Sequence, residues 1–287
     1  MLIILIVMPK MKFNLYGIWI FRNRINEFVE EEIMEYVKEN EKIWDERSEN
    51  NDTWSVPVTS EMVKLAKEGC WSIVLTPTKS VPSNWFPERL DEKKILCLAS
   101  GGGQQGPILA AAGADVTVFD NSMKQLEKDI FVAKRDNLKI KTVQGNMQDL
   151  SVFDDESFDC IIHPWSNGYI DDVLPVWKEC ARVLKKNGIL MAGFGNPIEH
   201  IFNAAKLEQG IFSVENKIPY ADIEHMDDPE TRKIVESGGY LWSHTLEKQI
   251  QGQIEAGFAI VGFYEDIGGT ALDEFISSSI ATKAIKL

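Results

Sequence analysis

A cluster of three glycines, Gly101–Gly103, marks the part of the sequence best suited to bind a nucleotide-like ligand. An apolar run at 95–99 precedes it, and a helix-compatible segment and a second apolar run at 116–119 follow, ending at Asp120. In this order of strand, turn, helix, strand and acid, bare backbone approaches the ligand and the carboxylate accepts hydrogen bonds from a ribose. Glycine is needed because a Cβ would block the approach and because the turn can require a positive φ.

The identity of the ligand does not follow from the glycines alone. The spacing Gly101-x-Gly103-x-x-Gly106 fits a nicotinamide or flavin dinucleotide, and it fits a nucleoside such as S-adenosylmethionine equally well. A glycine-rich turn that binds nothing is the third reading. Choosing between these alternatives requires the rest of the chain.

Composition and net charge indicate which classes of partner are poor candidates. The chain has 287 residues, of which 44% are hydrophobic, and a formal net charge of −14. Such a negative field repels phosphate backbones, so DNA, RNA and anionic membranes are poor partners. The segment at 1–8 is apolar, but it is too short to span a bilayer and stops at Pro9.

The cysteines are scattered without the Cys-x-x-Cys spacing of a zinc site, and two of them lie in apolar runs typical of buried thiols. We therefore expect no metal site, no disulfide framework and a reducing cytoplasmic location. The four are Cys70, Cys97, Cys160 and Cys180.

Strand and helix patterns alternate from residue 93 onward, which predicts an α/β fold: a Rossmann-like, doubly wound, mostly parallel seven-stranded sheet with helices on both faces. Residues 1–90 are expected to form a helical N-terminal extension or lid, and 91–287 the ligand-binding domain, with an insertion at 196–243 that lacks clean periodicity. Strands are expected at 95–99, 116–120, 140–144, 158–163, 189–193, 258–265 and 275–285, and helices at 107–112, 122–135, 173–184 and 245–256.

With its motifs in this order, the segment 93–287 resembles the class I S-adenosylmethionine-dependent methyltransferases. The family's first motif stands here as the run 96–103, and the acid after the second strand as Asp120. Further matches are GNMQDL at 145–150, DESFD at 155–159, RVLKKNG at 182–188 and EAGF at 255–258. The sequence departs from the family pattern at three positions: Cys97 replaces the acid of the first motif, Ala99 its first glycine and Asn146 the aspartate of the adenine side.

The resemblance implies that the cofactor is S-adenosylmethionine. Gly101 and Gly103 would line its methionine moiety, and Asp120 would accept hydrogen bonds from the ribose hydroxyls. The expected cofactor-binding residues are Ala99, Ser100, Gly101, Gly103, Asp120, Asn121, Met123, Asn146, Met147, Gln148 and His163.

One histidine is the candidate general base. His163 ends the fourth predicted strand, beside the expected crevice, and its setting His163-Pro164-Trp165 partly resembles the Asn/Asp-Pro-Pro-Tyr tetrad of amino-group methyltransferases. The alternative is a histidine that only packs against the cofactor or hydrogen-bonds to backbone. Candidate substrate contacts are the aromatic residues Trp44, Trp54, Trp165 and Tyr169.

The expected function is therefore transfer of a methyl group from S-adenosylmethionine to a small-molecule acceptor, at an oxygen or a nitrogen atom. Two alternatives remain at this stage: an NAD(P)-dependent oxidoreductase, and a protein that binds S-adenosylmethionine without catalysis. The sequence contains no Tyr-x-x-x-Lys pair, which disfavours the oxidoreductase. Nucleic acid and membrane are not expected as partners, and homodimer formation is left open.

Overall fold

The structure, a computed structural model, describes residues 35–287. The apolar segment at 1–8 and most of the helix expected near 26–42 lie outside the described residues. The chain divides into two compact units, Met1–Lys38 and Glu39–Leu287, and the second contains the whole sheet. Residues 39–90 belong to this second unit. A helix covers the beginning of this segment, as far as residue 49.

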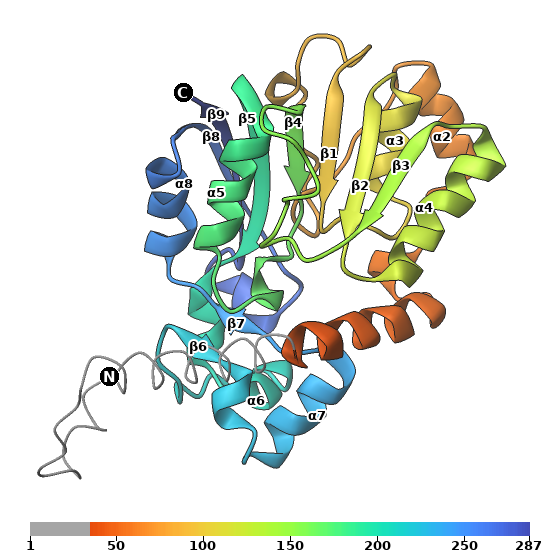
Figure 1. The fold of residues 1–287 in the computed structure, drawn as a ribbon. Helices are drawn as coiled ribbons and strands as arrows, with labels where there is room; N and C mark the ends of the chain where they lie inside the picture. Colours follow the sequence, from red (N-terminus) through yellow and green to blue (C-terminus); the bar gives the residue numbers. More distant parts are fainter. Residues whose placement is uncertain (1–34) are drawn as a thin grey trace, which may run out of the picture. The chain divides into compact units, whose positions relative to one another are not determined.

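A seven-stranded sheet in the order β3-β2-β1-β4-β5-β9-β8 organises the unit (Figure 1). The first five strands pair in parallel, while β9 is antiparallel to both β5 and β8. This confirms the predicted doubly wound, mostly parallel sheet. Its strands are β1 (Lys94–Leu98), β2 (Asp115–Asp120), β3 (Ile140–Gln144), β4 (Phe158–His163), β5 (Leu184–Gly195), β8 (Phe258–Asp266) and β9 (Ser279–Lys286).

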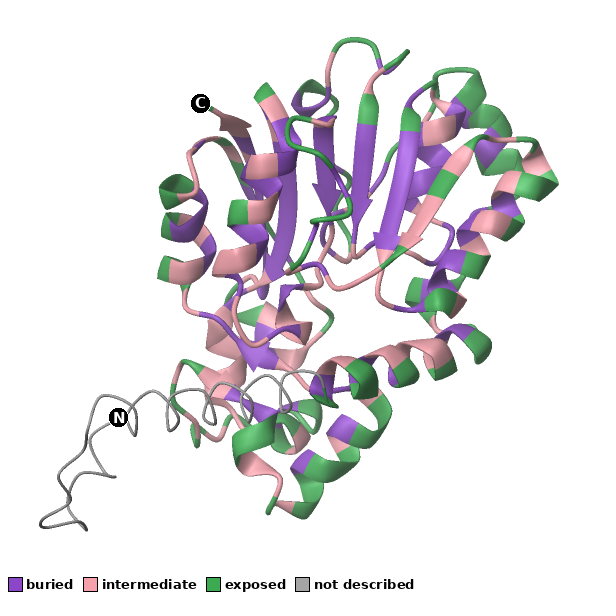
Figure 2. Ribbon diagram, viewed as in Figure 1, coloured by how far each residue is buried: buried purple, intermediate pink, exposed green. Residues whose placement is uncertain are grey.

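Helices cover both faces because the central strands are apolar on both sides, as parallel strands usually are. In β1, Ile95 and Cys97 belong to one core cluster, together with residues of α2, α3 and α4, and Leu96 and Leu98 belong to the other, with residues of α5. Figure 2 shows this as buried colour along the central strands. The helices are α2 (Ser60–Lys67), α3 (Gln105–Ala111), α4 (Met123–Asp136), α5 (Leu174–Val183) and α8 (Gly252–Glu255), with a π-helical turn η7 (Glu247–Gln251) before α8.

The segment between β5 and η7, here called the cap (residues 196–243), is built from short elements. A two-stranded sheet of two-residue strands, single helical turns and one ten-residue helix replace the regular alternation of strands and helices, which explains why the sequence shows no clean periodicity there (Figure 1). The elements are η5 (Pro197–Ile201), α6 (Ala204–Glu208), β6 (Tyr220–Ala221), η6 (Asp222–His225), α7 (Pro229–Gly238) and β7 (Trp242–Ser243).

Further single turns of helix lie outside the cap, and one of them accounts for a difference from the sequence-based expectation. The last strand begins at Ser279 instead of residue 275, because η8, where Thr270 and Asp273 make a capping box, is followed by a turn at Phe275 and an irregular stretch to residue 278. The basic residues and Gly188 of 185–188 predict a turn, but the segment is part of β5, with Asn187 at φ 62°. The other turns are η2 (Thr53–Ser55), η3 (Ser83–Trp85), η4 (Asn167–Tyr169) and η8 (Ala271–Glu274).

The start of α4 agrees with its prediction, whereas its buried face does not. Ser122 caps the helix, and its hydroxyl accepts from the Gln125 N–H. The helical spacing of Met123, Leu126, Ile130 and Ala133 predicts that these residues face the core, but Met123 is 40% exposed. The buried residues are Gln125, Leu126, Asp129 and Val132. Among residues 35–287, no helix combines the length and the apolar composition that a bilayer crossing requires.

Candidate functional site

The glycine-rich turn after β1 is anchored to the acid that ends β2. The Gly101 N–H donates to Oδ2 of Asp120 at 2.8 Å, and the Ser122 N–H donates to Oδ1 at 2.9 Å. A Cβ on Gly101 would lie 2.6 Å from the Cβ of Gln125 and 3.1 Å from Asp120 Oδ2. The sequence therefore needs glycine at position 101, since any larger residue would displace helix α4 or the carboxylate.

Backbone conformation explains part of the turn's composition. Gly102 and Gly103 have φ angles of 105° and 72°, which side chains disfavour. Ala99, at the position where the resembled family has its first glycine, also has a positive φ of 47°. The turn thus keeps a glycine-like backbone at Ala99, at a steric cost that the surrounding strands absorb.

Asp120 has the chemistry that a ribose site requires. The side chain is half-buried, and each carboxylate oxygen accepts one backbone hydrogen bond, which leaves lone pairs for further donors. Burial raises the pKa of this carboxyl to about 6, against the lowering effect of the Gly101 and Ser122 N–H groups. At neutral pH the group is largely ionised, and it can accept charge-assisted hydrogen bonds from hydroxyls.

A second acid beneath the turn, Asp129 of α4, was not singled out from the sequence. It is fully buried, its Oδ2 accepts from the Gly103 N–H at 3.1 Å, and its Oδ1 has no hydrogen-bond partner. Burial, with Asp120 nearby, raises its pKa to about 8, so the carboxyl is protonated at neutral pH. In sequence it resembles any helical acid, and only the packing of α4 against the turn distinguishes it.

The segment 45–58 packs over the same turn. Oδ1 of Asp45 accepts from the Ser122 hydroxyl at 2.6 Å and from the Lys124 N–H at 3.1 Å. The Val58 N–H donates to the Gly103 carbonyl at 2.9 Å. The side chain of Gln104 donates to two carbonyls of the segment, at positions 53 and 56. These hydrogen bonds hold the segment 45–58 against the glycine turn and the start of α4.

The predicted adenine-side residues meet at the carboxyl ends of β2 and β3, which pair from Val116–Ile140 to Asp120–Gln144. The Gln148 N–H donates to Oδ1 of Asn146 at 3.0 Å, and the Gln148 amide donates to Asp171 Oδ1 at 2.9 Å. Met123 is substantially exposed, while Met147 is 9% exposed. Asn121 follows Asp120 directly and is half-buried. Ser100 of the turn is buried, with its hydroxyl 3.4 Å from Oε1 of Gln105.

His163 ends β4 with no exposed surface. Its Nδ1 lies 3.0 Å from the Leu98 carbonyl and its Nε2 2.6 Å from Oδ1 of Asn167, whose amide donates to Gln249. Burial lowers the pKa of the imidazole below its ordinary value, so the ring is neutral at pH 7. A neutral ring carries one N–H, so it can donate either to the Leu98 carbonyl or to Oδ1 of Asn167, but not to both. When Nδ1 carries the proton, Nε2 can accept one only after Oδ1 of Asn167 turns away from it.

The four predicted aromatic substrate contacts do not share one place. Trp44 and Tyr169 pack edge to face at 5.3 Å between ring centroids, and the Arg47 guanidinium lies 4.2 Å from the Trp44 ring centroid. A Cβ on Gly102 would lie 2.5 Å from the backbone carbonyl of Trp54, so Trp54 lies beside the glycine turn. Trp165 instead lines a cavity in the cap.

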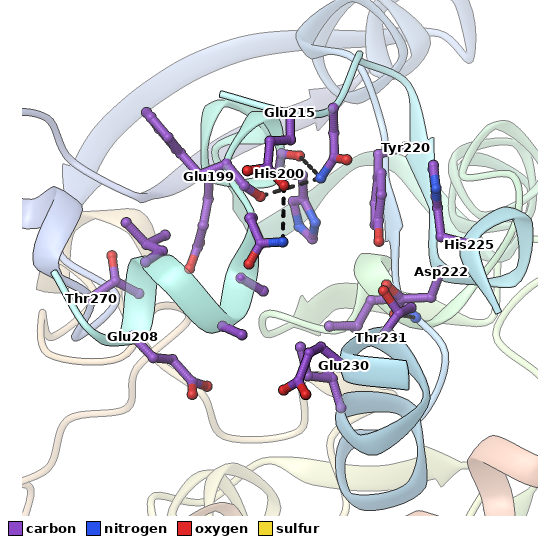
Figure 3. A pocket seen from close by; sticks show the side chains of 18 of the residues that line it. Glu199, His200, Glu208, Glu215, Tyr220, Asp222, His225, Glu230, Thr231 and Thr270 are labelled. Atoms are coloured by element: carbon purple, nitrogen blue, oxygen red, sulfur yellow. Dashed lines mark hydrogen bonds between the residues drawn. The ribbon is translucent and has the colours of Figure 1, made fainter. Parts of the chain in front are cut away.

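That cavity has a volume of about 750 Å³ and lies among η5, α6, η6 and α7 of the cap (Figure 3). Trp165, two residues after β4, joins it to the sheet, and a Cβ on Gly195 at the end of β5 would lie 3.2 Å from the Trp165 ring. The cavity is therefore beside the carboxyl ends of β4 and β5, the edge at which open α/β sheets bind ligands.

Three rings stack along one wall of the cavity. Tyr220 lies between His200 and His225, with centroid separations of 5.8 and 4.8 Å (Figure 3). Burial lowers the pKa of His200 to about 4, so this ring is neutral at pH 7. The sequence marks 196–243 as an insertion and allows its histidines a surface or substrate-pocket role, but nothing in the local spacing sets Tyr220 apart. Among the described residues, no group of three potential metal ligands forms a metal site.

Comparison with known proteins shows that the chain is similar to methyltransferases. A family model described as a methyltransferase domain matches residues 96–192. The uncharacterized methyltransferase YbaJ of Bacillus subtilis (strain 168) is 52% identical over 252 residues, which cover 88% of this chain and 98% of that protein. A ubiquinone biosynthesis O-methyltransferase of Histophilus somni (strain 2336) is 31% identical over 134 residues, 45% of this chain and 55% of that protein.

Solved structures share the fold. An S-adenosylmethionine-dependent methyltransferase from Mesorhizobium loti superposes with a TM-score of 0.55 at 17% identity, covering 71% of this chain and 94% of that one. A similar enzyme from Methanosarcina mazei gives a TM-score of 0.52 at 20% identity, covering 71% and 95%. At these identities the likeness concerns the arrangement of strands and helices.

Proposed function

We propose that this chain, which belongs to the family of S-adenosylmethionine-dependent methyltransferases, methylates a small-molecule acceptor at an oxygen or nitrogen atom. Family membership sets aside the nicotinamide oxidoreductase that the glycine spacing alone allows. The observation that carries the proposal is the anchored turn, where Asp120 holds the Gly101 N–H and keeps lone pairs for a ribose.

The residues of the turn fit the cofactor. A Cβ at Gly101 would collide with Gln125 and Asp120, so the turn preserves a narrow backbone surface of the kind that the methionine moiety would follow. Asp120 would accept from the ribose hydroxyls, and Asn121, Met123, Asn146, Met147 and Gln148 would surround the adenine. Ala99, Ser100 and Gly103 would complete the turn. Cys97, in place of the family's acid, is buried in the core and offers no charge to the ligand.

S-adenosylmethionine supplies a sulfonium-bound methyl group that is already activated. The protein's task is then to hold the acceptor in line with that group and to exclude water, which positioning alone accomplishes for a deprotonated nucleophile. We propose His163 as the base for an acceptor that is protonated at neutral pH. In that role Asn167 must move away from Nε2, and Nε2 then takes the proton of the acceptor.

Turnover tests the proposal directly. The purified chain is incubated with S-adenosylmethionine and pools of hydroxyl- and amine-bearing metabolites, and S-adenosylhomocysteine is quantified by mass spectrometry. We expect acceptor-dependent formation of S-adenosylhomocysteine that Asp120→Ala lowers at subsaturating S-adenosylmethionine. Tight cofactor binding without turnover in any pool would instead support a non-catalytic S-adenosylmethionine-binding protein.

A further inference from the structure

The cap cavity carries an excess of negative charge. Six carboxylates line it, whereas no lysine or arginine occurs among the described lining residues (Figure 3). The six are Glu199, Glu208, Glu215, Asp222, Asp228 and Glu230. An anion entering such a cavity meets like charges in a medium of lowered dielectric constant, where repulsion is stronger than in water.

Two of these carboxylates are paired with lysines and do not need a ligand. Glu215 forms an ion pair with Lys206, and Glu230 pairs with Lys233 at 2.9 Å. Glu230 and Glu215 therefore contribute little net charge to a bound molecule.

Two more carboxylates serve the cap's own backbone. Asp228 caps α7 and accepts from the Thr231 N–H at 3.1 Å. Asp222 accepts from the Leu241 N–H at 2.9 Å, which fixes the pairing of the two short strands. Both groups are occupied by protein donors.

Glu199 differs from these four and from Glu208, which is exposed. It lies in η5, directly after the end of β5, and its carboxylate has no hydrogen bond or ion pair with any described residue. Burial, and then the charge of Asp273, raises its pKa to about 7. A carboxylate held in this way gains from a cation, which would replace the lost water and restore the ionised form.

The neighbouring residue adds a second side chain without a protein hydrogen bond. The His200 imidazole lines the same cavity, stacks against Tyr220 and hydrogen-bonds through neither ring nitrogen to any described residue. His200 is half-buried, so its ring nitrogens are available to a ligand that fills the cavity. The Glu199 carboxylate and a ring nitrogen of His200 are thus available to accept hydrogen bonds from a ligand in the cavity.

We propose that the cap cavity is the acceptor site and that it takes a positively charged, amine-bearing small molecule, whose ammonium group is held by Glu199 beside His200. The inference rests on the proposed methyltransferase function and adds the chemical class of the acceptor. The ammonium is a recognition group, and the atom that is methylated can be another one. Apolar residues such as Phe202, Leu207 and Ile234 in the lining would contact the uncharged body of the molecule.

A set of three probes with one ring system tests the charge preference: tryptamine as the cation, N-acetyltryptamine as the neutral form and indole-3-propionate as the anion. Each is titrated by calorimetry into the full chain saturated with S-adenosylhomocysteine. We expect tryptamine to bind at least about tenfold more tightly than indole-3-propionate at low salt. Equal affinities, or no saturable binding of tryptamine in the millimolar range, would overturn the inference.

Glu199→Gln locates the effect. It should weaken tryptamine about tenfold and leave N-acetyltryptamine within about twofold, because only the charge partner is lost. Glu236→Gln on α7 removes the same charge from an exposed position outside the cavity and serves as the control. If both variants weaken tryptamine equally, the preference reflects the overall negative charge and the site assignment is wrong.

Unchanged S-adenosylhomocysteine affinity and thermal unfolding confirm that Glu199→Gln is folded. They also separate the two hypotheses. Failure of the wild-type chain to bind S-adenosylhomocysteine would refute the proposed function, whereas normal binding without a cation preference would refute only the acceptor class.

Discussion

The cofactor turn and the cap form their binding surfaces from different parts of the chain, the backbone in one and the side chains in the other. At the turn, the backbone itself forms the surface, and Asp120 and Asp129 accept hydrogen bonds from the N–H groups of the turn and of Ser122. In the cap, side chains form the surface, and the Glu199 carboxylate and the His200 imidazole make no hydrogen bond to any described residue. A backbone surface suits an unvarying cofactor, and a side-chain surface can be altered to suit a particular acceptor.

The two regions also differ in how strongly their packing restricts substitution. A Cβ on Gly101, Gly102 or Gly103 would come within 3.0 Å or less of another atom, whereas a Cβ on Gly238 in α7 or Gly210 after α6 would meet nothing within 4 Å. We therefore expect substitutions of the turn's glycines to act through sterics, and substitutions of the cap's acids to act through charge. The Glu199→Gln experiment tests the cap, and four experiments test the turn and the residues packed around it.

The largest effect is expected at Gly101. Gly101→Val forces branched atoms into Gln125 and Asp120, so the turn cannot keep its shape and S-adenosylmethionine binding should be lost in calorimetry. Gly238→Ala is the matched control, because its Cβ enters open space, and it should bind normally. Retained binding by Gly101→Val would refute the assignment of the turn.

The next effect concerns His163 and affects rate more than affinity. If it is the base, His163→Gln should lower kcat by roughly 10²–10⁴ and leave cofactor affinity within a few-fold. The pH–rate profile should show an ascending limb below the ordinary histidine pKa, since burial lowers the pKa of this ring, and the limb should vanish in the variant. A parallel, modest fall of affinity and rate would identify a packing role.

Asp120 should affect affinity through its charge. Asp120→Ala removes an acceptor of the ribose and the anchor of the Gly101 N–H, and we expect at least a tenfold loss of S-adenosylmethionine affinity, from hydrogen bonds worth roughly 1.5–3 kcal/mol each. Because the pKa of Asp120 is about 6, wild-type affinity should also fall as the pH is lowered through 6. Unaltered affinity in the variant would exclude Asp120 from the site.

The smallest effect is on stability and comes from Asp129. Its pKa is 3.8 in an unfolded chain and about 8 when folded, so between these values the folded state holds a proton that the unfolded state has lost. The free energy of unfolding contributed by this group therefore falls as the pH rises from about 4 to about 8.

Asp129→Asn keeps the shape without the titration and should flatten the decline of Tm with rising pH. The exposed Asp154→Asn is the control and should leave the slope unchanged. An identical slope in wild type and Asp129→Asn would show that Asp129 does not titrate in this way.

The sequence by itself determined the sheet, the turn and the acid after β2. Parallel strands buried on both sides must be apolar runs, and a backbone surface for a ligand must be glycine-rich, so both leave local signatures; the apolar segment at 158–163 coincides with the buried strand β4. The edge strand β3 is only partly buried, yet the segment predicted at 140–144 also coincides with it. Ser122 as the cap of α4 is equally local, because capping involves residues three positions apart.

The tertiary structure alone decided which side chains meet. Asp129 becomes a buried, protonated acid only because α4 packs on the turn, and His163 receives both of its partners from Leu98 and Asn167, which are distant or unremarkable in sequence. Glu199 and His200 enter the cavity because short cap elements fold around it. Such contacts depend on long-range packing, which has no period and no motif, and therefore no sequence signal.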